Sequence, residues 1–115
     1  MNNGYVYLVV EWDRIEENLV PCKIGVTQGS IENRIKKLQT GNSSNLHTFT
    51  YFKSDHVFKL EKMLHRHYHK YNTSGEWFNF PDDIVMRFKS TCEENENLIK
   101  FLLKENYYYG KKCNY

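Results

Sequence analysis

The residues best suited to chemistry gather in one basic segment, residues 53–70. This segment holds five Lys and Arg residues and four His residues, against Asp55 and Glu61 as its only acids. The formal net charge of the whole chain is only +2. A local excess of cations matters more for binding phosphate than the overall sum does. The segment is therefore compatible with an anionic partner such as nucleic acid, without requiring one.

Glu61 and His65 are four residues apart, which places them on one face of a helix. A lone carboxylate there could ligate a hard divalent cation whose shell is completed by water. It could equally be a solvated charge or half of an i,i+4 ion pair. His65 could orient Glu61, act as a base, bind phosphate or pack against the helix. His65 and His69 also have the spacing of a zinc pair, but the zinc-protease pattern of Glu directly after the first His is absent, so zinc is not expected.

The first element that must position these groups is a strand over residues 4–10, followed by a second strand over residues 21–26. The polar residues between them are too few for a crossover helix, so we expect an antiparallel hairpin. This pairing would bring Tyr7 and Lys23 close together. A free phenol has a pKa of about 10, and a neighbouring ammonium would lower it, so that Tyr7 could take a proton from water. The alternatives are that Tyr7 packs in the sheet and that Lys23 contacts phosphate.

A short helix is expected after Ser30, which can accept a hydrogen bond as its N-cap, and it should end at Gly41-Asn42-Ser43-Ser44-Asn45. Its apolar face consists of Ile31, Ile35 and Leu38. Arg34, Lys36 and Lys37 fall outside that face. The planar fork of an arginine suits two phosphate oxygens, although a surface role for Arg34 is the simpler alternative.

The remaining elements complete an α+β fold. We expect a third strand over 47–52, followed by a helix that Ser54 or Asp55 caps and that ends near 71. An extended stretch over 76–80 should follow, with Trp77 and Phe78 as core residues, and a short helix should begin at 81. A last helix should cover 93–105 with Leu98, Phe101 and Leu102 facing inward, before a frayed tail at 107–115. The expected architecture is a three-stranded antiparallel sheet flanked by helices, with extra C-terminal helices.

The bulk properties fit one intracellular domain. A chain of 115 residues has room for one core, and we expect a single domain over 1–115. No apolar run reaches the roughly 20 residues that span a bilayer, so no membrane partner is expected. The N-terminus lacks the features of a signal peptide, which favours the cytoplasm, or the nucleus of a host cell if the chain is viral. Cys22, Cys92 and Cys113 suggest reduced thiols rather than a disulfide framework or a zinc site.

Five short motifs follow one another in a characteristic order. They are Tyr5-Val6-Tyr7, Lys23-Ile24-Gly25-Val26-Thr27, Ser30-x3-Arg34-x3-Leu38-Gln39-Thr40-Gly41-Asn42, Leu60-Glu61-x2-Leu64-His65 and Gly75-Glu76-Trp77-Phe78. In this order the chain resembles the GIY-YIG endonuclease superfamily, and within it the phage T5 type branch of phages and large DNA viruses. The match covers about residues 4–80, which we expect to be the core, with 81–106 as a helical extension and 107–115 as a tail. Tyr5 stands where the first motif has Gly, and Lys23 where the second usually has Tyr.

The resemblance implies hydrolysis of DNA phosphodiesters with one divalent metal, Mg²⁺ or Mn²⁺. It makes Tyr7, Lys23, Arg34 and Glu61 catalytic residues, with Glu61 as the metal ligand. Beside them we expect His65 to be catalytic, because of its spacing from Glu61. The expected partner is duplex or branched DNA. We expect it to contact Arg34, the neighbouring Lys36 and Lys37, and Asn79, which matches a family residue only by a looser alignment. Glu76 could support the site or form a surface ion pair.

Three functions remain open at the level of sequence. They are a metal-dependent DNA endonuclease, a nucleic-acid-binding module that kept the scaffold but lost activity, and a protein-interaction domain. If both strands of a duplex are cut, one metal per site would require two copies of the chain, as in a homodimer, or two successive nicks.

Overall fold

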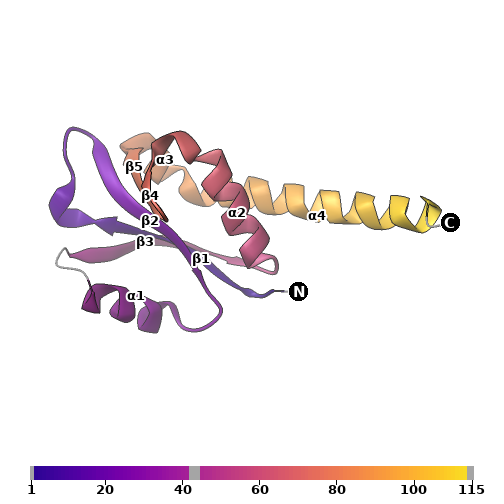
Figure 1. Ribbon diagram of the computed structural model, residues 1–115, viewed down its shortest axis with the longest axis horizontal. Helices are drawn as coiled ribbons and strands as arrows, with labels where there is room; N and C mark the ends of the chain where they lie inside the picture. The colour runs from indigo at the N-terminus through magenta and orange to yellow at the C-terminus, as the bar shows by residue number, and fades with distance from the viewer. Residues whose placement is uncertain (1, 42–44, 114–115) are drawn as a thin grey trace.

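The computed structural model describes residues 2–41 and 45–113, with side chains described as far as residue 104. Its centre is one antiparallel sheet of five strands in the order β3-β1-β2-β5-β4. The strands are β1 (Gly4–Glu11), β2 (Leu19–Thr27), β3 (Leu46–Ser54), β4 (Asn72–Ser74) and β5 (Trp77–Pro81). The helices are α1 (Ile31–Thr40), α2 (Val57–His67), α3 (Asp82–Met86) and α4 (Phe88–Cys113), with short 3₁₀ turns at Trp12–Arg14 and His69–Tyr71. Helix α1 covers one face of the sheet, and α2, α3 and α4 lie on the other side (Figure 1).

The alternation of side chains along β1 explains this layered arrangement. Val6, Leu8 and Val10 belong to the larger core beneath α2 and α4, while Tyr7 and Val9 belong to a smaller cluster beneath α1. All five are buried, so β1 is covered on both faces. The strand pairing expected from sequence is confirmed, with Tyr7 opposite Gly25 and Val9 opposite Lys23.

The sheet has five strands rather than the three expected. Residues 72–75 were expected only to break a helix, but they form β4 and a tight turn into β5. Gly75 adopts a φ of +56°, a conformation that favours glycine, and the Asn72 amide donates to the carbonyls of Gly75 and Trp77. The turn returns the chain so that β5 pairs with β2 from Leu19–Pro81 to Lys23–Trp77.

The ends of α1 and α2 differ in part from expectation. Ser30 caps α1, because its hydroxyl accepts from the backbone of Asn33. Gly41 ends that helix with an ordinary negative φ rather than a left-handed one, and residues 42–44 of the expected stop lie outside the described residues. Helix α2 begins after His56, because the Ser54 hydroxyl instead accepts from the His56 N–H and donates to Glu96.

Helix α4 is longer than expected and uses a different face. It starts at Phe88 and continues to Cys113, through most of the segment expected to be a frayed tail; residues 114–115 lie outside the described part. Leu98, Phe101 and Leu102, expected inward, are 45–58% exposed. Another stripe of the helix faces the body instead, formed by Phe88, Cys92, Glu96 and Ile99. The buried Glu96 carboxylate fixes this choice, since it accepts from Ser54 at 2.7 Å and from the backbone of Asp55 at 3.4 Å.

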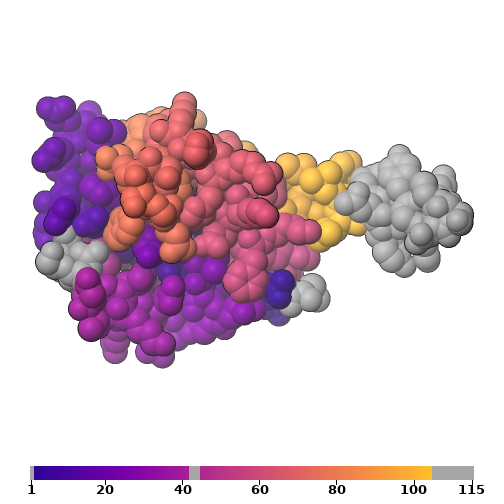
Figure 2. Space-filling view, viewed as in Figure 1, coloured from indigo at the N-terminus to yellow at the C-terminus, as the bar shows by residue number. Residues whose placement is uncertain are grey.

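Two further expectations concern the cysteines and a possible membrane span. Cys22 and Cys92 are buried free thiols, as expected, whereas the side chain of Cys113 is not among those described. No helix within the described residues is both long and apolar enough to cross a membrane. In Figure 2 the yellow part of α4 leads away from the body formed by the sheet and the other helices.

Candidate active site

The candidate site lies at the edge of β2 where strand pairing stops. On its inner side β2 pairs with β1 as far as Thr27, but on its outer side the β5 ladder ends at Lys23. The backbone N–H and carbonyl of the next residue, Ile24, meet two other groups on this outer side. Its N–H donates to the backbone carbonyl of Glu76 at 3.1 Å, and its carbonyl lies 3.3 Å from Nε2 of His65. Side chains from both faces of the sheet can meet around this edge.

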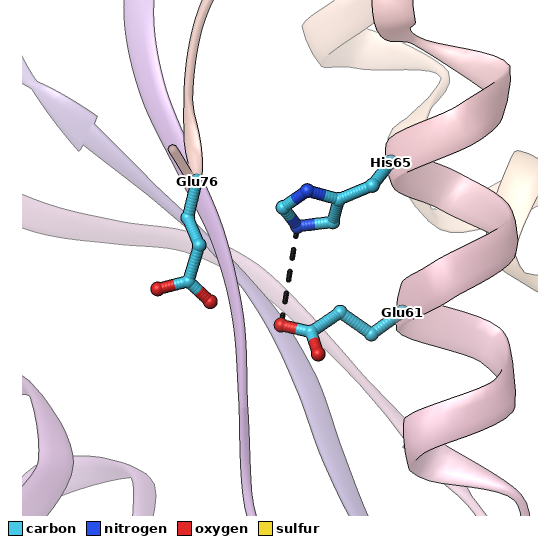
Figure 3. A group of neighbouring side chains, drawn as sticks. All are labelled: Glu61, His65 and Glu76. Atoms are coloured by element: carbon cyan, nitrogen blue, oxygen red, sulfur yellow. Dashed lines mark ion pairs between the residues drawn. The ribbon is translucent and has the colours of Figure 1, made fainter. Parts of the chain in front are cut away.

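Two carboxylates and one imidazole converge there. Glu61 and His65 come from successive turns of α2, and Glu76 comes from the turn between β4 and β5; Figure 3 shows the three pointing toward one another. One potential ligand atom from each lies within 4.8 Å of the other two. His65 Nε2 is 3.9 Å from Glu61, and its ring packs edge-on against Phe78. The cluster opens into a cavity of about 430 Å³ that Phe58 and Lys62 also line.

Two cationic side chains border this cluster on the α1 face. The Lys23 ammonium lies 3.4 Å from a Glu76 carboxylate oxygen and 5.7 Å from the centre of the Trp77 ring. The Nε of Arg34 donates a hydrogen bond to the Tyr7 hydroxyl at 3.2 Å. Helix α1 presents Arg34 inward because its apolar residues Ile35 and Leu38 pack against the cluster around Tyr7.

Gly25 allows Tyr7 to reach this position. It lies opposite Tyr7 in the β1–β2 pair, and a Cβ on residue 25 would collide with the phenol ring and hydroxyl of Tyr7. Any larger residue at position 25 would displace the phenol that accepts from Arg34. The glycine of the second motif is thus required by the tyrosine of the first.

Burial and the neighbouring carboxylate raise the pKa of Glu61 to about 7. Desolvation has the largest effect, followed by a hydrogen bond with Glu76 and the charge of Glu76, while Arg34 and Lys23 act in the opposite direction. Glu61 therefore still holds a proton in part of the molecules near neutral pH. A group of oxygen and nitrogen ligands with surplus negative charge fits a divalent cation, since a cation would replace that proton.

The surroundings of the Tyr7 hydroxyl differ from those expected. Lys23 was expected to lower the pKa of the phenol, but its ammonium pairs with Glu76 instead. Burial raises the pKa of Tyr7 above its usual value, and the hydrogen bond and charge of Arg34 offset this only in part. The phenol is therefore protonated near neutral pH, and its hydroxyl accepts a hydrogen bond from Arg34.

The other expected residues lie outside this cluster. Lys36 and Lys37 are exposed on α1. Asn79 is exposed on β5 opposite Pro21 and lines a separate groove. The contribution of Glu76 as a third potential ligand was missed by the sequence reasoning, which left its role open. Its signal was a lone acid directly after Gly75, but only the turn shows that it points toward α2.

Comparison with known proteins identifies the family. No curated protein and no solved structure matches the chain. The T5orf172 domain model matches residues 4–93, which include β1 through β5, α1 to α3 and every residue of the cluster described above. The chain therefore belongs to the T5orf172 domain family.

Proposed function

We propose that the protein is a metal-dependent DNA endonuclease that hydrolyses phosphodiester bonds at a one-metal site, as in the GIY-YIG superfamily. The T5orf172 family includes nuclease-like proteins, which supports a role on nucleic acid. The observation that carries the proposal is the meeting of Glu61, Glu76 and His65 with Arg34 and Lys23 around one strand edge. A carboxylate cluster beside two cations suits a reaction that needs both a metal ligand set and phosphate binding.

Glu61, Glu76 and His65 would hold the divalent cation. Mg²⁺ and Mn²⁺ both accept carboxylate oxygens, and the imidazole adds a ligand that favours Mn²⁺ over Mg²⁺. When bound, such a cation would neutralise charge on the phosphate and stabilise the leaving oxygen. The proton shared near Glu61 would leave as the cation binds, since the ligands must be deprotonated.

Arg34 and Tyr7 would act on the phosphate as a pair. Nε of Arg34 donates to the Tyr7 hydroxyl, and this hydrogen bond fixes the plane of the guanidinium group. Its terminal nitrogens would then donate to two phosphate oxygens. The protonated phenol can donate its own hydrogen to a phosphate oxygen or to the attacking water. Pre-oriented donors of this kind stabilise charge that develops in the transition state.

Lys23 would contribute a mobile positive charge. In the structure its ammonium lies between Glu76 and Trp77. With Glu76 serving as a metal ligand, Lys23 would be held less strongly by Glu76, and its ammonium would contact the substrate phosphate. The Lys of the second motif would then bind phosphate, one of the alternatives open at the level of sequence.

One observation favours a second candidate, a nucleic-acid-binding module without activity. The Lys23 ammonium already neutralises Glu76 at 3.4 Å, and it could serve there in place of a metal. Such a module would bind DNA through Arg34 and Lys23 equally well with and without a divalent cation.

A cleavage assay separates the two candidates. Supercoiled plasmid and branched DNA would be incubated with the wild type, Glu61→Ala and Arg34→Ala, with Mg²⁺, with Mn²⁺ and with EDTA. The endonuclease predicts metal-dependent cutting that falls by about 100-fold or more in both variants, the usual effect of losing one such group. Lys100→Ala, an exposed cation on α4 outside the site, is the control and should retain activity within a fewfold. Binding without metal-dependent cutting by the wild type would support the inactive module.

A further inference from the structure

A second concavity lies on the other side of Trp77 from the cluster. This groove has a volume of about 480 Å³, within the range of small-molecule sites. The part of its lining that matters here consists of Arg14, Pro21, Thr73, Ser74, Trp77 and Asn79. In Figure 2 the orange surface of the β4–β5 hairpin lies between the violet surface that follows β1 and the pink surface of α2. The hairpin therefore separates the groove from the ligand cluster while contributing to both.

The pairing of β2 with β5 fixes the spacing between groove and site. Lys23 is opposite Trp77, and Pro21 is opposite Asn79, so both pairs face the same side of the sheet. Two residues along a strand span about 6.6 Å. The Pro21–Asn79 pair is thus one short step from the cation that borders the candidate site.

The two ends of this surface differ in charge. At the site end, Lys23 and Arg34 are cationic and suit a phosphate. At the groove end, Glu11 and Arg14 both belong to the lining, and their charges offset because the two side chains pair at 3.4 Å. The rest of the exposed lining consists of the Asn79 amide, two hydroxyls, Pro21 and the ring of Trp77. A surface of balanced charge with hydrogen-bonding groups beside one flat indole ring suits a nucleobase, which has both donors and acceptors on its edge and an apolar face.

We propose that this groove binds an unpaired nucleobase adjacent to the phosphate at Lys23 and Arg34, so that the substrate is DNA with a single-stranded segment or branch. A base inside a duplex is stacked on both faces and paired along its edge, and it cannot enter a groove of this size without leaving the helix. A base that is already unpaired enters the groove without the free-energy cost of breaking a base pair. The inference deepens the proposed function and rests on it for the identity of the phosphate site.

Tryptophan fluorescence in EDTA tests the groove without any cleavage. Trp12 and Trp77 are the two tryptophans of the chain, so Trp12→Phe leaves Trp77 as the reporter. In this background, a 12-nucleotide single strand should quench the emission and bind several-fold more tightly than a duplex of the same length. Asn79→Ala should weaken single-strand binding roughly fivefold, the effect of one lost hydrogen bond, and leave duplex binding unchanged. Asn97 is an exposed asparagine on α4 outside the groove, so Asn97→Ala should change neither single-strand binding nor duplex binding.

Equal or tighter binding of the duplex would overturn the inference, as would identical single-strand affinities for Asn79→Ala and Asn97→Ala, or no quenching by either DNA. Asn79 is exposed, so loss of folding is not a concern for its variant. A cleavage arm with Mn²⁺ then compares a flapped duplex with a continuous one. A preference for single strands without any cutting would refute the proposed nuclease activity but support base binding in the groove. Cutting with no preference for the flap, or with a preference that Asn79→Ala leaves intact, would refute the groove and keep the nuclease.

Discussion

Tyr7 and Gly25 face each other across the β1–β2 pair, and the phenol of Tyr7 fills the space that a side chain at residue 25 would need. This close approach joins the first two sequence motifs in one structural unit. It also places the Tyr7 hydroxyl where Arg34 can donate to it.

Gly25→Ala should therefore destabilise the fold by about 1–3 kcal/mol, the usual cost of overpacking a core. Chemical denaturation monitored by circular dichroism would measure the change. Gly29→Ala is the matched control, because a Cβ there would meet its nearest atom at an ordinary 3.8 Å. Equal unfolding midpoints for the two variants would show that the phenol does not depend on residue 25.

Tyr7→Phe should preserve folding and lower activity. The ring would still fill the buried cluster, but Arg34 would lose the acceptor that orients its guanidinium. We expect the single-turnover cleavage rate to fall by about 10- to 100-fold, with the thermal midpoint nearly unchanged. A wild-type rate in this variant would mean that Arg34 needs no orienting partner.

The raised pKa of Glu61 predicts an unusual pH dependence of stability. A carboxyl whose pKa rises from 4.5 unfolded to about 7 folded adds stability that is fully present below pH 4.5 and is lost as pH rises through 7. In EDTA, the wild type should thus lose stability relative to Glu61→Gln between pH 5 and pH 8. Denaturant unfolding of both proteins at the two pH values measures this difference. Parallel changes in the two proteins would contradict the shared proton.

His65 should set the preference among metals. Imidazole is a better ligand for Mn²⁺ than for Mg²⁺, so isothermal titration calorimetry should give tighter Mn²⁺ binding by the wild type. His65→Ala should weaken Mn²⁺ binding by about 10-fold or more and affect Mg²⁺ less, because Mg²⁺ depends on oxygen ligands. His67→Ala, two residues along the same helix and packed on Tyr68, is the control and should bind both ions as the wild type does. A similar loss of both ions in His65→Ala would remove the imidazole from the ligand set.

The sequence predicted those parts of the site that depend on local periodicity. The alternation of β1 places Tyr7 beneath α1, and helical spacing places Glu61 and His65 on one face of α2. Glu76 could not be placed, because its direction depends on a turn made by Gly75 and the Asn72 amide. The buried face of α4 was missed because two apolar stripes compete along it and a hydrogen bond from Ser54, distant in sequence, decides between them.

The direction of the Tyr7 pKa shift was also beyond the sequence. It depends on how deeply β1 is covered and on which acid receives the Lys23 ammonium. Both follow from the assembled sheet and its two helical layers. Strand and helix patterns locate side chains on faces, whereas the energies of their ionisation depend on burial and on neighbours from other elements.

The central claim is that one divalent cation binds between α2 and the β4–β5 turn, beside Arg34. Crystals grown with Mn²⁺ and examined by anomalous diffraction at the manganese edge test it most directly. We expect one strong peak within about 2.3 Å of carboxylate oxygens from both Glu61 and Glu76, with the His65 ring turned toward it. A peak at other residues, or none at millimolar Mn²⁺, would contradict the metal site and with it the proposed hydrolysis.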